Sequence, residues 1–378
     1  MGGKLQSDDI LVNALGGVVR VRLDYSAHSL DETRLQALRD PWVDAAAMDQ
    51  EVTSGETDVF ELSWPFPDEE NLGRSIADLS THATLAAIEG RRGRLLMLHA
   101  AGVADEDGRV LAFIGPSGRG KTTLARTLGQ HYAYVTDETV GIEPDGTVHS
   151  YRKPLSIIRE GEAHKEQVAP SLLGLKELPG SDLRLAGLVL VSRVPDLQGR
   201  PEITTLELCE ALAAIVPEVS YLADLEEPLQ MMARLVDRCG AIRQVTYREA
   251  SDVPPLVPEL LTESPSETWE PVLPVQESVG AHSSLHEVTY VPEPVLDAVE
   301  ASGQTAIIDT SRVVHILDGV GPVIWRSLCA GGDFEKVARD VEAMFGTPPD
   351  RGLDEAVSGV LRALADAGLL RRIPDRAA

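Results

Sequence analysis

The feature that most limits the fold is the glycine-rich segment Gly115-Pro116-Ser117-Gly118-Arg119-Gly120-Lys121-Thr122, which fits G-x-x-x-x-G-K-[ST] at every fixed position. An apolar run typical of a buried strand, Val110-Leu111-Ala112-Phe113-Ile114, comes directly before it. After it, Leu124, Ala125 and Leu128 recur at helical spacing. A strand, a glycine loop and a helix in this order predict an α/β fold with the loop at the end of a strand.

The residue types of this loop suit the binding of phosphate. Glycines allow successive backbone N–H groups to face phosphate oxygens, and the N-terminus of the following helix adds partial positive charge. Lys121 is then expected to reach the β- and γ-phosphates, and the Thr122 hydroxyl to ligate Mg²⁺. The alternative is an ordinary glycine-rich turn between a strand and a helix. We predict ATP and Mg²⁺ as cofactors, and a nucleotide-binding loop made of Gly115, Pro116, Ser117, Gly118, Arg119, Gly120, Lys121, Thr122 and Thr123.

The chain of 378 residues is long enough for two or three domains. Residues 1–68 are predicted to form a small β-rich module, and residues 69–260 the P-loop domain. Residues 261–284 are rich in Pro, Ser and Glu and are predicted to be a linker, followed by a small unit of strands and helices at 285–374. Within the P-loop domain we expect strands at 95–100, 132–136, 185–191 and 241–247, and helices at 121–131, 203–213 and 231–239.

The charge balance limits the partners. With 34 basic and 60 acidic residues the net charge is −26, which disfavours nucleic acid and anionic membrane surfaces. No apolar stretch is long enough to span a bilayer, and the N-terminus lacks a signal-peptide pattern. The three cysteines, Cys209, Cys239 and Cys329, are widely spaced. These features predict a cytoplasmic protein with reduced cysteines.

Many P-loop ATPases hold Mg²⁺ with an acid that closes a second apolar strand. The run Leu188-Val189-Leu190-Val191 ends instead in Ser192-Arg193. The acidic pair Asp137-Glu138 lies 16 residues after Lys121, one helix and one strand later. That spacing predicts that the pair returns to the edge of the sheet beside the phosphates.

Leu98-His99-Ala100, the P-loop and Val135-Thr136-Asp137-Glu138, followed by Tyr151-Arg152-Lys153-Pro154-Leu155, together resemble the HPr kinase/phosphorylase family. The resemblance implies a fold related to the nucleotide domain of phosphoenolpyruvate carboxykinases. It also implies that Asp137 is the base for a substrate serine, that Glu138 helps to hold Mg²⁺, and that His99 lines the site. The family usually has Asp-Asp where this chain has Asp-Glu, and its C-terminal signature loop is not found, so HPr is not the expected substrate.

Each of these residues also has a plainer interpretation. Asp137 could cap the turn after a strand, and a histidine in an apolar strand is often a hydrogen-bonded core residue. Arg152, Lys153 and Arg193 are the nearest cations, and we expect each to be an ordinary surface residue.

Residues from about 286 to 373 resemble the PqqD family of winged-helix-like domains. The matching features are two strands through Val313 to Leu317, the Val323-Ile324-Trp325 helix and a last helix that ends in Ala367-Gly368-Leu369-Leu370. The resemblance implies that a leader peptide adds as a strand to the edge of the sheet. The alternatives are winged-helix domains for oligomerisation or for DNA, and the acidic charge disfavours DNA.

Together these patterns favour an ATP-dependent serine kinase that acts on a ribosomally made precursor peptide, as in peptide-tailoring kinases near lasso-peptide pathways. Other tailoring enzymes are possible partners, and an oligomer is possible. One alternative is a non-catalytic scaffold that uses nucleotide as a switch and presents the peptide to partner enzymes. A small-molecule phosphotransferase is the other.

Overall fold

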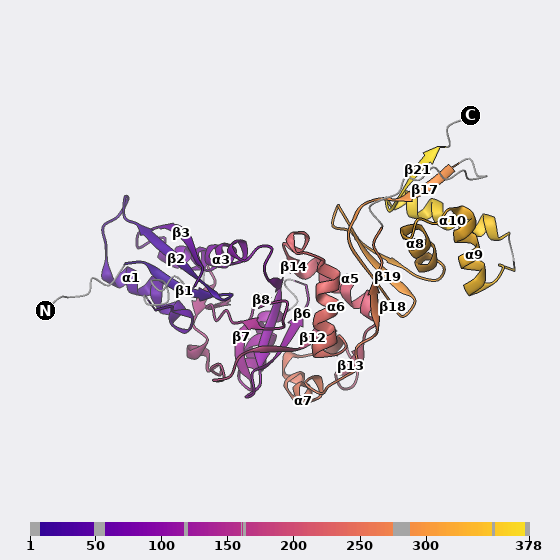
Figure 1. The fold of residues 1–378 in the computed structure, drawn as a ribbon. Helices are drawn as coiled ribbons and strands as arrows, with labels where there is room; N and C mark the ends of the chain where they lie inside the picture. Colours follow the sequence, from indigo (N-terminus) through magenta and orange to yellow (C-terminus); the bar gives the residue numbers. More distant parts are fainter. Residues whose placement is uncertain are drawn as a thin grey trace. The chain divides into compact units, whose positions relative to one another are not determined.

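The structure, a computed structural model, describes residues 8–48, 57–116, 120–159, 161, 164–274, 288–349 and 352–374 (Figure 1). The chain forms two compact units. The first holds residues 1–205, 218–225 and 238–264, and the second holds 206–217, 226–237 and 265–378. The predicted boundaries at 68, 260 and 284 stay predictions. Within the predicted P-loop domain, however, residues 206–217 and 226–237 pack in the second unit.

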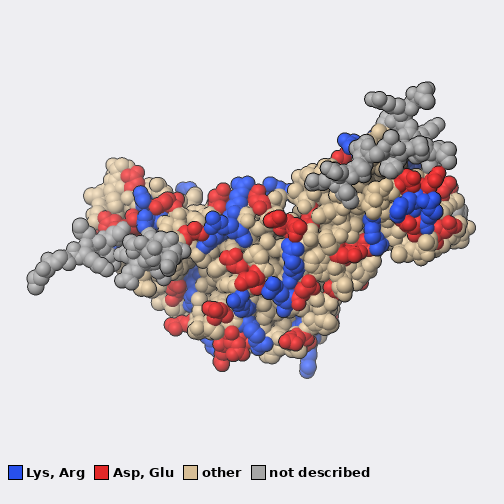
Figure 2. Space-filling view, in the orientation of Figure 1, with Lys and Arg blue, Asp and Glu red and all other residues tan. Residues whose placement is uncertain are grey.

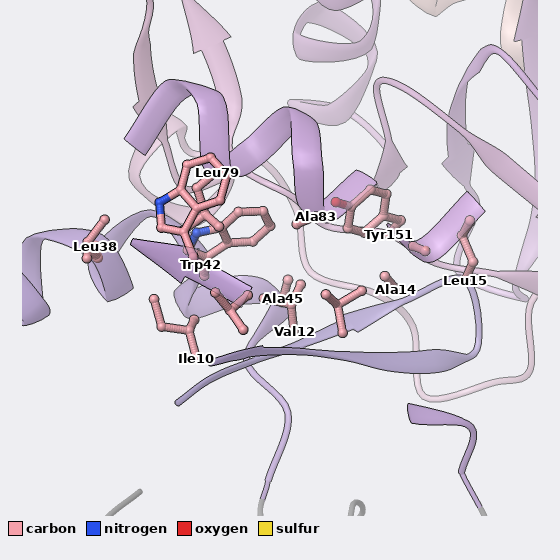
Figure 3. Close-up of a cluster of buried hydrophobic side chains, with 14 of the residues drawn as sticks. Ile10, Val12, Ala14, Leu15, Leu38, Trp42, Ala45, Leu79, Ala83 and Tyr151 are labelled. Carbon is pink, nitrogen blue, oxygen red and sulfur yellow. The ribbon is translucent and has the colours of Figure 1, made fainter. Parts of the chain in front are cut away.

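The first unit opens with a three-stranded sheet. β2 (Gly17–Asp24) pairs antiparallel with β1 (Ile10–Ala14) and parallel with β3 (Val59–Pro65). The apolar sides of β1 and β2 pack against α3 (Leu72–Gly90), as Figure 3 shows for part of this buried cluster. The sequence predicted a β-rich module here but not β1, nor α1 (Glu32–Arg39), which begins at the N-cap Asp31, nor the 3₁₀ helix η1 (Asp40–Ala45).

A six-stranded sheet carries the P-loop, in the order β13-β15-β12-β6-β5-β7. β12 is parallel to β6 and β15, and β5 is antiparallel to both β6 and β7, so β6 and β7 run in the same direction. The strands β6 and β7 therefore end at the same edge of the sheet. Their bounds are β5 Ala100–Ala104, β6 Arg109–Ile114, β7 Ala133–Thr136, β12 Arg184–Arg193, β13 Glu202–Thr205 and β15 Arg243–Tyr247, and the P-loop helix α4 is Lys121–Gly129.

The predicted strand at 95–100 is divided at His99. Residues Leu96–Leu98 form β4, which joins a different, four-stranded sheet of order β14-β4-β8-β9. Beyond His99 the chain enters β5 of the P-loop sheet. The other strands of the four-stranded sheet are β8 Val140–Ile142, β9 Val148–His149 and β14 Val219–Ser220, and a separate hairpin pairs β10 Leu155–Ile157 with β11 Glu166–Val168.

The predicted helix at 203–213 is wrong in its first half. Glu202–Thr205 is β13, which pairs antiparallel with β15, and the helix α5 begins only at Leu208. The β-branched Ile203, Thr204 and Thr205 suit the paired edge of a sheet better than a helix. The remaining helices of this region are α5 Leu208–Ile215, α6 Pro228–Cys239, α7 Val257–Leu260 and the 3₁₀ helices η2 Ser171–Leu173, η3 Val216–Glu218, η4 Leu222–Asp224, η5 Ala250–Asp252 and η6 Pro254–Leu256.

The second unit is built on a four-stranded antiparallel sheet of order β16-β18-β19-β20. The strands are β16 Trp269–Pro271, β18 Val295–Ala301, β19 Gln304–Asp309 and β20 Val314–Leu317, with a separate ribbon of β17 Val288–Pro292 and β21 Leu370–Pro374. Helices α8 Gly321–Cys329, α9 Phe334–Phe345 and α10 Leu353–Asp366 follow, as the sequence predicted.

The predicted linker at 261–284 is in part folded. Trp269–Pro271 is the edge strand β16, and Val272 is buried in the core of the second unit. The Trp325 indole donates to the Val272 carbonyl at 3.0 Å. Pairing of β16 with β18 and burial of Val272 bind this part of the segment to the second unit. Residues 275–287 lie outside the described part of the chain.

Acidic and basic side chains are interleaved over the face shown in Figure 2. Within the described ranges, no helix is both long and apolar enough to cross a lipid bilayer.

Candidate active site

Two glycines shape the described ends of the P-loop. A Cβ atom on Gly115 would lie 2.8 Å from Cγ2 of Val191 on β12, so only glycine lets the loop leave β6 this close to its neighbour. Gly120 has φ +93° and forms the left-handed N-cap of α4, a conformation that favours glycine. The predicted loop residues Ser117, Gly118 and Arg119 lie outside the described residues.

Lys121 is the first residue of α4 and its side chain is buried. Its ammonium group donates to the carbonyl oxygen of Gly115, across the mouth of the loop. Burial lowers the pKa of Lys121, although Glu218 and Glu138 act in the opposite direction. A buried cation whose described partner is a neutral carbonyl is placed to attract an anion.

The acidic pair sits in a turn made by Thr136. The Thr136 hydroxyl accepts from the backbone N–H groups of Glu138 and Thr139, at 3.2 and 3.4 Å. The Glu138 carbonyl accepts from the backbone N–H of Ala100, which lies opposite Ile114 at the end of β6. The turn therefore places Asp137 and Glu138 at the edge of the sheet where the P-loop begins, as the spacing predicted.

Asp137 is buried and has two described neighbours. The Tyr134 hydroxyl donates to its Oδ1 at 3.0 Å, and the Lys153 ammonium lies 3.4 Å from the same oxygen. Lys153 Nζ also lies 3.3 Å from Oε2 of Glu138, whose side chain is more exposed. Burial lowers the pKa of Lys153, but attraction to Asp137 and Glu138 outweighs this effect and raises the pKa above its ordinary value. A buried ammonium thus joins the two carboxylates.

Lys121, Asp137, Glu138 and Lys153 line one cavity of about 550 Å³. The lining holds four cationic and two acidic side chains, an excess of positive charge on a chain whose net charge is −26. Such a cavity attracts a polyanion such as a nucleoside triphosphate. The lining residues are His99, Gly120, Lys121, Thr122, Thr123, Arg126, Asp137, Glu138, Lys153, Ser156, Ile157, Ile158 and Lys165.

The structure therefore brings together the predicted His99, Asp137, Glu138 and the described lysine end of the P-loop. Gly115 and Pro116 lie at the strand end of the loop and do not line the cavity. The roles predicted for these residues stay predictions.

Two of the three cations expected at the surface are buried. Lys153 lines the cavity, and Arg152 donates to the backbone carbonyls of Tyr134 and Lys176, at 2.6 and 3.0 Å. Arg193 is at the surface as expected, in an ion pair with Glu249. This burial could not be predicted from local pattern, because a buried lysine is recognised by its carboxylate partners and these precede Lys153 by 15 residues or more.

The oxygen ligands of the cavity fit a magnesium ion bound with a nucleotide. Mg²⁺ is usually held by one or two protein oxygens together with phosphates and water. Thr122 and Glu138 offer a hydroxyl and a half-exposed carboxylate in the same cavity. No group of three or more His, Cys, Asp or Glu side chains in the described residues could hold a metal by itself, so phosphates would have to complete the site.

The fold and the cavity define an α/β protein of the P-loop class. No family model matches the chain, and no curated protein matches it. A solved structure that does match is the Hpr(Ser) kinase/phosphatase from Coxiella burnetii, which is 13% identical. The match covers 44% of this chain and 93% of that one, with a TM-score of 0.23. A match at this level does not show which family this chain belongs to. The P-loop class follows from the residues of the chain itself.

Proposed function

We propose that the first unit transfers the γ-phosphoryl group of ATP to a hydroxyl group. The observation that carries the proposal is that Asp137 lines the same cavity as Lys121 and Thr122 of the P-loop. A P-loop alone would serve a nucleotide switch equally well. A carboxylate beside the phosphates adds the group that phosphoryl transfer to a hydroxyl requires.

In this mechanism the chain's own residues position and neutralise charge. Lys121 exchanges its contact with the Gly115 carbonyl for the β- and γ-phosphates, and the N-terminus of α4 faces the same phosphates. Thr122 and Glu138 would hold Mg²⁺, which when bound neutralises charge that develops on the phosphates.

Asp137 acts as the base in the transfer step. The acceptor oxygen forms a bond to the γ-phosphorus while the bond from that phosphorus to the β–γ bridging oxygen breaks and ADP leaves. The acceptor proton passes to Asp137. Lys153 lies between the two acids and partly offsets the repulsion between their charges and those of the phosphates.

For the acceptor, we propose a serine of a ribosomally made precursor peptide that the C-terminal domain recruits by its leader. Support comes from the resemblance of this segment to PqqD domains and from β20, an edge strand that pairs with β19 alone among the described strands. An edge of this kind can accept a further strand. The exposed Val313 directly precedes it.

The alternatives differ in what happens to the peptide. A nucleotide-switched scaffold binds leader and ATP but adds no phosphate, whereas a small-molecule phosphotransferase consumes ATP without binding leader. The test incubates the full chain with ATP, Mg²⁺ and synthetic precursor peptides encoded beside its gene, and measures intact peptide mass. We expect the mass of one phosphoryl group to be added.

Asp137→Asn is the key variant. It keeps the shape of the side chain but removes the base, so transfer should fall by about 100-fold or more while ATP affinity stays within about threefold. Transfer near the wild-type rate would exclude Asp137 as the base. No added mass with any of the peptides, together with leader binding, would favour the scaffold.

A proline in the paired segment of the leader tests recruitment. It removes a backbone donor, so binding to the full chain should weaken relative to an alanine at the same position. The full chain is needed, because α5 packs on β19 and β20 and removal of the C-terminal strands would uncover that helix.

A further inference from the structure

The two oxygens of Asp137 have different surroundings. Oδ1 accepts the hydrogen bond from the Tyr134 hydroxyl at 3.0 Å and lies 3.4 Å from the Lys153 ammonium. Among the described residues, both of these contacts are to Oδ1, and no hydrogen bond reaches Oδ2. One oxygen is thus held by the protein, and the other is left to a molecule in the cavity.

The group that holds Oδ1 is itself fixed. Tyr134 is fully buried in β7, with its ring packed in the core of the P-loop sheet. The Arg152 guanidinium lies 5.6 Å from the centre of that ring and donates to the Tyr134 backbone carbonyl. The phenol cannot turn to another partner without disturbing this packing, so its hydroxyl defines the position of Oδ1.

We propose that Tyr134 and Lys153 are positioning residues that hold Asp137 by Oδ1, so that Oδ2 takes the proton of the acceptor. The inference rests on the proposed phosphoryl transfer, and it adds two residues that had no predicted role in it: Tyr134, and Lys153, which was expected to lie at the surface. A carboxylate held at one oxygen cannot rotate away from the acceptor, and misplacement of a reacting group by about 1 Å can cost about 100-fold in rate.

The chain provides a matched control. Tyr151 is also fully buried, and its hydroxyl is hydrogen-bonded to Thr84 Oγ1 at 2.9 Å. Tyr134→Phe and Tyr151→Phe each remove one buried, bonded hydroxyl from the same unit. Of the two hydroxyl groups, that of Tyr134 is hydrogen-bonded to Asp137 and that of Tyr151 to Thr84. General loss of packing therefore affects both variants, and loss of the bond to Asp137 affects one.

The experiment measures phosphate release from ATP and Mg²⁺ with water as the acceptor, for the full chain. We expect Tyr134→Phe to lower kcat by about tenfold or more, with KM for ATP within about twofold, because a hydrogen bond to a charged group is lost. Tyr151→Phe should stay within about twofold of wild type in both constants. Lys153→Met should behave like Tyr134→Phe if it folds, and thermal unfolding with bound ATP reports on folding.

A second arm shows whether the effect passes through Asp137. In the Asp137→Asn background, Tyr134→Phe should cause no further loss of kcat, because residues that act through one group are not additive. An equal effect of the two tyrosine substitutions, or an additive loss with Asp137→Asn, would overturn the inference and leave the proposed function standing. A wild-type chain that neither hydrolyses ATP nor phosphorylates peptides would remove the proposed function itself.

Discussion

The side chain of His99 is hydrogen-bonded to the backbone of Glu138: its Nδ1 lies 3.1 Å from the Glu138 carbonyl oxygen. Because a carbonyl oxygen only accepts, Nδ1 carries the hydrogen of this bond. His99 sits where the chain leaves β4 and enters β5, so the bond ties the acidic turn to the point where the two sheets meet. The histidine predicted to line the site therefore also supports the turn that carries Asp137.

His99→Ala should weaken catalysis more than nucleotide binding. Loss of the bond frees the Glu138 turn, and we expect kcat for phosphoryl transfer to fall by about tenfold while ATP affinity stays within about threefold. Steady-state kinetics and nucleotide titration measure the two effects. His131→Ala, at an exposed position of the same unit, is the control. Equal kinetics for the two variants would show that the bond has no catalytic role.

Lys121→Ala should abolish most of the affinity for ATP. The substitution removes the buried ammonium group that faces the loop, and we expect binding to weaken by about 10- to 100-fold. Isothermal titration with ATP and Mg²⁺ measures this change. The exposed Lys176 provides the control, because Lys176→Ala removes the same charge away from the cavity. If both variants bound ATP as the wild type does, the P-loop assignment would be wrong.

Asp297→Ala should destabilise the second unit. The buried carboxylate accepts from the backbone N–H and the side-chain amide of Gln230, at 2.9 and 2.8 Å, and from the N–H of Ala298. Its removal leaves buried donors unpaired, and we expect the free energy of unfolding to fall by about 2–4 kcal/mol. Urea unfolding followed by circular dichroism measures it. The exposed Asp366 is the control, and its replacement by alanine should cost less than about 0.5 kcal/mol. Equal losses of unfolding free energy in the two variants would show that the hydrogen bonds of Asp297 do not stabilise the second unit.

Asp309 makes the second unit sensitive to acid. Burial raises the pKa of Asp309, but hydrogen bonds from His315, Ser311 and Val313 outweigh it and lower the pKa from 3.8 to about 2. Because the pKa is lower in the folded state, the stabilisation is present above the unfolded value and is lost as pH falls from about 4 toward about 2. Wild type should therefore exceed Asp309→Asn in free energy of unfolding at about pH 6, and the difference should shrink at about pH 3. A difference that did not depend on pH would show that the carboxylate contributes through packing alone.

The sequence located the parts of the site that follow from local pattern. The P-loop has a fixed spacing, and Asp137 and Glu138 follow from one helix and one strand placed after it. Lys153 could not be placed in this way, because a lysine before a proline has no local mark of burial. It is buried because the chain returns beneath the acidic turn after a hairpin, which is a property of the tertiary fold.

In the fold, too, elements with a local pattern were predicted and those that depend on tertiary pairing were not. Helices were expected in the C-terminal unit and form at 321–329, 334–345 and 353–366, and the Asp333 side chain caps the second of them as an N-cap residue does. The strands β16 and β18 were missed, since their pairing joins residues about 30 apart through a segment of polar composition. The strand at 95–100 was interrupted at His99 because its two halves pair in different sheets.

The division of the chain into interleaved units has a consequence for synthesis. The thiol of Cys209 on α5 contacts the carbonyl oxygen of Val299 on β18, a residue that lies 90 positions later in the chain. At about 5–20 residues per second, a ribosome takes roughly 5–20 s to make the intervening chain. During that interval the apolar side of α5, with Leu208, Leu212 and Ile215, has no sheet to cover it. Chaperones that bind nascent chains should therefore meet this protein at α5, before its second unit can close.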